Sequence, residues 1–170
     1  MSFIVNQKAK LKDLDLPYSY TERVLEFFSL GGILSIWGYL INLYSEIPEI
    51  IPRHFSLSGE PDAFGDKSLL WLLPIIATII YAAMTYVAKI PHLYNYPVKI
   101  TAENAAEKFL IARKMVNFIK FIIVAFFVYM SFNMVYTGMG NQSLINIWFL
   151  AAFLAGLLAP VVYYFIKIRK

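Results

Sequence analysis

The stretch Ile47–Lys67, IPEIIPRHFSLSGEPDAFGDK, separates two long apolar segments and concentrates proline, glycine and charged residues between them. Pro52 restricts the local backbone to extended or turn conformations, whereas Gly59 and Gly65 permit positive φ angles. The sequence GEPD at 59–62 is strong turn chemistry. The stretch is therefore predicted to be a compact, ordered loop between two helices, and a functional site is expected here.

The segments on either side have the composition of a membrane protein. The chain is 59% hydrophobic and 15% charged, with a mean hydropathy of +0.61, whereas soluble domains are roughly 45–50% apolar and about 25% charged. One transmembrane helix needs about 20 apolar residues, so 170 residues leave room for a few spans and no separate soluble enzyme domain. We predict an all-α integral membrane protein, a single domain built as a bundle of four transmembrane helices.

The apolar runs and the capping residues beside them define the expected elements. The predicted spans are 24–44, 69–90, 117–137 and 147–166, with an outer loop at 45–68 and a connection at 91–116. Thr21 is expected to cap the first helix, Asp66 or Ser68 the second, and Thr101 a further helix before the third span. This further helix either runs along the membrane interface or rises into the third span.

Several polar side chains fall within or beside these spans. Lys120 lies within about a turn of the expected end of the third span, so we expect it to snorkel towards the headgroups. A functional intramembrane lysine is the alternative. Thr78, Tyr81 and Thr85 share one helical face, which indicates hydrogen bonds between helices or, alternatively, a ligand pathway.

Small residues recur at helical spacing in the first and last spans. Gly31 and Ser35 would let another helix approach closely, and Ala151, Ala155 and Ala159 form a smooth packing face. These faces permit a homo-oligomer without requiring one.

The distribution of lysine and arginine predicts the orientation. Basic residues gather in both terminal segments and in the middle connection, namely Lys8, Lys10, Lys12, Arg23, Lys89, Lys99, Lys108, Arg113, Lys114, Lys167, Arg169 and Lys170. The loop at 45–68 has two basic residues against five acidic ones. By the positive-inside rule, both termini are expected to be cytoplasmic and the loop is expected to lie outside the membrane. Because the basic residues flank apolar runs, no nucleic-acid partner is expected.

The loop also supplies the candidate site residues. Phe55, Leu57 and Phe64 are apolar enough to fold it onto the helix ends. The structural motif comprises Pro52, Gly59 and Gly65, and the candidate ligand-binding side chains are Phe55, His54, Glu60, Asp62 and Lys67. Hydrogen bonds from His54 and Lys67 to Asp62 and the turn backbone would equally serve to fold the loop.

These residues resemble a bacterial membrane family, the domain of unknown function numbered sixteen-forty-eight. Its hallmark is an I-P-x-H-F segment, then G-x-x-D, then glycine and lysine, matched by Ile51, Pro52, His54, Phe55, Gly59, Asp62, Gly65 and Lys67. The resemblance continues through residues 95–98, 101–104 and 112–113. The same domain occurs in the longer SdpI-type proteins, which confer immunity to a secreted toxic peptide. The resemblance implies a membrane setting and an accessory, sensing or immunity-type role.

Two functions follow as hypotheses. In the first, the outer loop recognises an extracytoplasmic peptide, protein or small ligand, and the protein is not an enzyme and needs no cofactor. In the second, His54 and a loop carboxylate, Asp62 in particular, bind a metal or act as a base with an orienting acid. A catalytic zinc site usually has three protein ligands, and His92, the other histidine, is expected across the membrane.

The chain contains no cysteine, so the orientation can be tested with one introduced residue. Ser58→Cys should react with a membrane-impermeant thiol reagent on intact cells, because the loop is placed outside. Lys99→Cys, in the connection placed inside, should react only after the cells are opened. Labelling of the two variants in the opposite order would refute the orientation.

Overall fold

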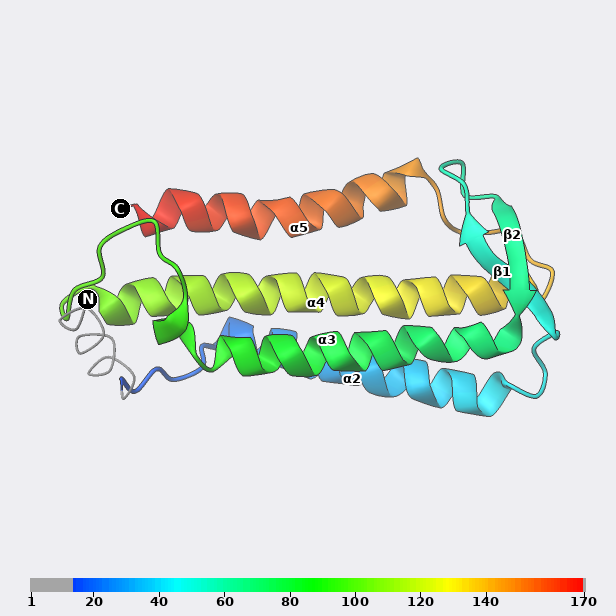
Figure 1. The fold of residues 1–170 in the computed structure, drawn as a ribbon, viewed down its shortest axis with the longest axis horizontal. Helices are drawn as coiled ribbons and strands as arrows, with labels where there is room; N and C mark the ends of the chain where they lie inside the picture. The colour runs from blue at the N-terminus through cyan, green and yellow to red at the C-terminus, as the bar shows by residue number, and fades with distance from the viewer. Residues whose placement is uncertain (1–13, 170) are drawn as a thin grey trace.

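Four long helices run side by side along the molecule, and a β-hairpin closes one end (Figure 1). The computed structural model describes residues 14–169. The helices are α2 Tyr20–Leu43, α3 Leu72–Ala88, α4 Ala105–Gly138 and α5 Ile147–Ile168, and the 3-10 turns are η1 Lys67–Trp71, which leads into α3, and η2 Pro91–Leu93. All four helices, α3 taken with η1, are long and apolar enough to cross a membrane.

Helix α4 is the centre of the bundle, since it packs against α2, α3 and α5. With 34 residues at about 1.5 Å each it measures about 51 Å, against a hydrocarbon core of about 30 Å. The helix therefore contains the predicted third span and most of the charged segment before it. Of the two courses open to that segment, along the interface or up into the span, it takes the second.

Helix α5 packs on α4 through aromatic rings. Phe149 stacks on Tyr129 with 4.1 Å between ring centroids, and Phe153 stacks on Phe126 at 4.4 Å. Gly156 lies against Ile122, whose side chain would be 3.2 Å from an added Cβ. The expected alanine packing face is not used within the chain, because its members, Ala151, Ala155 and Ala159, are all exposed.

The ordered loop predicted between the first two spans is confirmed and takes the form of an antiparallel β-hairpin. Strand β1, Ile50–Phe55, pairs with strand β2, Pro61–Asp66, and a register shift falls between Pro52 and His54. The turn joins Ser56 to Glu60 through a backbone hydrogen bond of 2.8 Å. The sequence predicts the turn but not the strands, since Pro52 interrupts a short run that otherwise has strand character.

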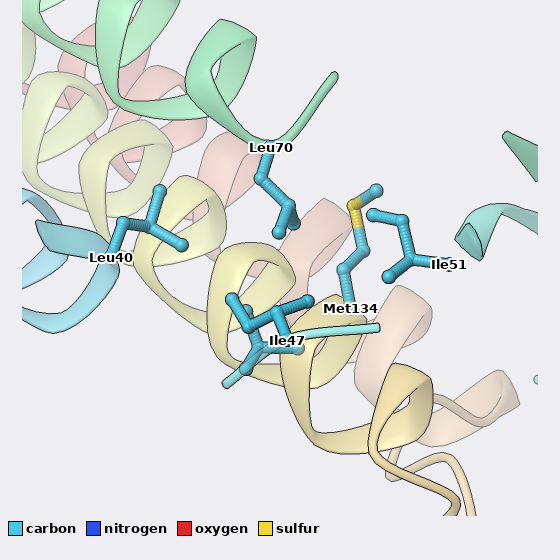
Figure 2. Close-up of a cluster of buried hydrophobic side chains, with 6 residues drawn as sticks. Leu40, Ile47, Ile51, Leu70 and Met134 are labelled. Carbon is cyan, nitrogen blue, oxygen red and sulfur yellow. The ribbon is translucent and has the colours of Figure 1, made fainter. Parts of the chain in front are cut away.

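A buried cluster holds the hairpin against the helix ends. It comprises Leu40, Ile47, Ile51, Leu70, Met134 and Val135, and Figure 2 shows the labelled members converging from α2, β1, η1 and α4. Phe55 packs against this cluster as expected, but Leu57 and Phe64 do not: both are exposed. Leu57 lies in the turn between the strands, and Phe64 points to the opposite face from its neighbour Gly65, which pairs with the buried Ile51.

Three capping predictions have different outcomes. Asp66 accepts a hydrogen bond from the Ser68 N–H, so it caps η1 as predicted. Hydrogen bonds from Ser68 lower the pKa of the Asp66 carboxyl group. Ser19, and not Thr21, caps α2, because Ser19 and Glu22 exchange hydrogen bonds in a capping box. Asn104, not Thr101, precedes α4, and its side chain accepts from the Thr101 N–H.

The hairpin turn should depend on glycine more strongly than other turns do. Gly59 has φ +88°, and an added Cβ would collide with the Ile145 carbonyl oxygen, whereas Gly140 has φ +90° and nothing within 4 Å. Both Gly→Ala changes add backbone strain of about 1–3 kcal/mol. Only Gly59→Ala adds the collision, so it should lower the melting temperature further than Gly140→Ala in detergent. Equal losses would show that the contact with Ile145 is unimportant.

Candidate functional site

Two of the predicted site residues meet on the surface of the hairpin. His54 Nδ1 lies 2.5 Å from Asp62 Oδ1, and their side chains remain 68% and 46% exposed. The pair joins neighbouring strands, since His54 stands opposite Ala63 in the β1–β2 register. Glu60 lies at the turn with its side chain exposed. The arrangement presents an imidazole and two carboxylates to solvent on a fixed backbone.

Lys67 does not reach Asp62, and holds the end of α2 instead. Its Nζ donates to the carbonyl oxygens of Tyr44 (3.3 Å) and Ile47 (3.1 Å), pairs with Glu49 at 3.0 Å, and lies 5.0 Å from the Tyr44 ring centroid. Because it makes these four contacts, Lys67 has a structural role. It satisfies backbone carbonyls left open where α2 ends.

Pro52 and Gly65 allow close packing beneath the hairpin. Pro52 is buried, and with Ile51 it lies against Gly138, at the end of α4. An added Cβ at Gly65 would be 2.9 Å from the Leu69 side chain. These residues hold the hairpin against the bundle. A ligand of the hairpin would therefore contact its exposed side chains.

The donor set of the hairpin is too small for a metal centre. Within residues 14–169 no group of three or more His, Cys, Asp or Glu side chains could hold a metal ion. His54 and Asp62 offer two donors, whereas structural zinc takes four protein ligands and catalytic zinc usually three. The other histidine, His92, belongs to the α3–α4 connection at the far end of the bundle (Figure 1).

A second cluster of ionisable side chains lies between α2 and α4, where the sequence analysis placed no site. Arg113 Nε donates to Glu22 Oε1 at 2.7 Å, and a second guanidinium nitrogen donates to Glu22 Oε2 at 3.3 Å. Asn117, one turn further along α4, donates to the same carboxylate. Glu22, Arg113 and Asn117 are all buried, so this is a charge-assisted pair removed from water.

Lys120 forms the next ion pair along the bundle, which corrects the expectation that it snorkels. Its side chain is 1% exposed and its Nζ pairs with the Glu26 carboxylate and donates to Thr85 at 3.0 Å. Tyr81 donates to the other Glu26 oxygen at 2.5 Å. The lysine turns inwards because α2 places a carboxylate, and α3 a hydroxyl, within its reach.

The shared face of α3 is thereby explained. Tyr81 and Thr85 complete the Lys120–Glu26 pair, and Thr78 accepts from the Trp37 indole N–H at 3.1 Å. The structure uses all three for hydrogen bonds between helices, as the first of the two sequence hypotheses stated.

A signal for the two ion pairs was present in the sequence. Glu22 and Glu26 are four residues apart, and Arg113, Asn117 and Lys120 follow at four and three, so each set lies on one helical face. The opposite charges of the two faces predict pairing. Arg113 was instead counted with the basic residues that orient the chain.

These observations define a multi-pass α-helical membrane protein with a short β-hairpin between its first two spans. Residues 31–78, which run from α2 through the hairpin into α3, match the family described as domain of unknown function (DUF1648). The match is confined to that segment of the chain, and it confirms the resemblance over these residues.

One curated relative is an uncharacterized protein of Archaeoglobus fulgidus (strain ATCC 49558 / DSM 4304 / JCM 9628 / NBRC 100126 / VC-16). It is 35% identical over 74 residues, which are 44% of this chain and 40% of the relative. The match thus spans about two fifths of the relative's length. No solved structure matches the chain.

Replacing one partner of the Glu26–Lys120 ion pair should lower the unfolding free energy more than replacing both partners. Glu26→Gln leaves the buried Lys120 ammonium without a counter-charge, with an expected loss of about 3 kcal/mol in unfolding free energy, whereas Glu26→Gln with Lys120→Met should recover most of it. Unfolding in mixed detergent micelles measures both.

Arg23→Gln is the matched control, because Arg23 is exposed on the same helix. It should change stability by less than about 0.5 kcal/mol. A double variant less stable than Glu26→Gln alone would contradict the argument.

Proposed function

We propose that this protein is a small recognition protein of the membrane, with a sensing, accessory or immunity-type role, whose hairpin binds an extracytoplasmic peptide or protein segment. The observation that carries the proposal is the exposure of large apolar side chains on an anchored hairpin. Ile50, Leu57 and Phe64 are 61%, 74% and 58% exposed. Exposed apolar groups rimmed by polar ones are typical of interaction sites.

The backbone of the hairpin offers a second means of binding. Among residues 14–169, strand β2 pairs with β1 alone, and β1 also packs against α4. The outer edge of β2 therefore presents backbone N–H and C=O groups to which an extended peptide can add as a third strand. Such a peptide would place alternate side chains beside Phe64.

The charge of the hairpin favours a basic ligand. Glu49, Glu60, Asp62 and Asp66 are exposed, whereas Lys67 is occupied by its contacts with α2 and Glu49. A basic, partly apolar peptide would gain both attraction during encounter and burial at Phe64. The family match supports the proposal because it covers the whole hairpin.

The proposed orientation places this surface outside the cell. The connection from α3 to α4 and the end of α5 lie at the opposite end of the bundle from the hairpin (Figure 1). That opposite end carries Lys89, Lys99, Lys114 and Arg169, while the hairpin end is acidic. The proposed membrane is the bacterial inner membrane, with both termini in the cytoplasm.

The proposal is tested by panning a displayed library of short basic peptides with alternating apolar residues against the protein in zwitterionic nanodiscs. Enriched peptides should bind Phe64→Ser at least about tenfold more weakly, a change of about 1.4 kcal/mol. Leu93→Ser is the matched control, because Leu93 is 61% exposed but lies in η2, at the other end of the bundle.

Three results would refute it. The first is a library with no enriched peptide. The second is an enriched peptide that binds Phe64→Ser as tightly as the unchanged protein. The third is an acidic analogue of an enriched peptide that binds equally well.

A further inference from the structure

A polar pocket of about 220 Å³ lies at the end of the bundle opposite the hairpin. The segment 14–18 forms one wall with Leu16 and Tyr18. The end of α3 and η2 contribute Lys89 and His92, and the first turns of α4 contribute Phe109 and Arg113. Three elements far apart in sequence therefore surround one cavity, which is independent of the proposed hairpin site.

Arg113 holds this pocket in shape. Besides its bonds to Glu22, the guanidinium donates to the carbonyl oxygens of Leu16 (2.6 Å) and Pro17 (2.8 Å). The Tyr18 ring covers it, with 4.4 Å from the ring centroid to Cζ. These contacts hold the segment 14–18 against α4, so the cavity is preformed. Four of the five N–H donors of Arg113 have protein partners, so most of the ligand binding falls to other side chains.

Two basic side chains line the pocket, Lys89 exposed at its rim and His92 half-buried. Lys89 and His92 make no side-chain hydrogen bond or ion pair among residues 14–169, and no Asp or Glu among these residues lines the pocket. Burial raises the pKa of the Tyr18 phenol, and a phenol is already protonated at neutral pH without any shift, so its hydroxyl is a donor. The volume exceeds what one water occupies, about 30 Å³. The lining therefore suits an anion with several oxygen atoms.

We propose that this pocket binds a phosphate group. Lys89 directly follows α3, so the pocket lies where a membrane-spanning helix ends and phospholipid headgroups begin. Basic pockets between transmembrane helices bind anionic headgroups in this position. The same side chains would donate hydrogen bonds to the phosphate of a soluble compound. Phosphate is the shared chemistry, and the two sources are separated by experiment.

The test uses the full chain, stripped of lipid in neutral detergent. Phosphatidylglycerol, phosphatidylcholine and inorganic phosphate are added separately, and binding is followed by native mass spectrometry and by the shift in melting temperature. Phosphatidylglycerol should bind at least about tenfold more tightly than phosphatidylcholine. Inorganic phosphate that binds and displaces the lipid would assign a soluble phosphate as ligand, and lipid that binds without such competition would assign the headgroup.

Variants locate the binding. Lys89→Gln with His92→Gln should abolish the preference for phosphatidylglycerol, while Lys89→Arg should retain it. Lys99→Gln is the control with an equal loss of charge, because Lys99 is exposed and outside the pocket. The proposal is overturned if both lipids bind equally to the unchanged protein, if the double variant keeps the preference, or if Lys99→Gln loses it to the same extent.

Discussion

Two carboxylates of α2 meet two cations of α4 inside the bundle, and the arrangement of the other helices depends on these pairs. Glu22 bonds to Arg113, and Glu26 pairs with Lys120. Helices in lipid gain little from apolar contact, because lipid chains are as apolar as leucine, so polar contacts carry much of their specificity. A charge left unpaired there is costly. One rotation and register of α2 on α4 satisfies both pairs.

Other elements are positioned by further hydrogen bonds to the side chains of these ion pairs. Helix α3 supplies Tyr81 and Thr85 to the Glu26–Lys120 pair, so it must lie in the groove between α2 and α4. The segment 14–18 is held by Arg113. At the other end the hairpin is fixed by apolar packing of Ile51 and by Lys67. The ion pairs between α2 and α4 thus lie towards one end of the bundle, and the apolar cluster with its hairpin lies at the other.

In the hairpin, the residues that pack against the bundle are distinct from the exposed residues to which we assign the proposed recognition. The residues that match the family pattern include both kinds: Ile51, Pro52 and Lys67 face the bundle, while His54 and Asp62 face solvent. A motif in a single sequence does not distinguish them, because the alternation of side chains across a strand becomes visible only once the register is known. The register shift after Pro52 makes that assignment harder still.

The sequence by itself determined the membrane-spanning helices, the ordered turn between the first two and the membrane setting, because these follow from hydropathy, length and local backbone chemistry. The direction of the Lys120 side chain could not be predicted in this way. The tertiary structure alone decided that Lys120 turns towards Glu26, that Arg113 closes a pocket, and that Phe64 stays exposed. Each of these depends on side chains brought together from distant parts of the chain. The opposite charges on the faces of α2 and α4 indicate that they can pair, but not how the helices are placed in space.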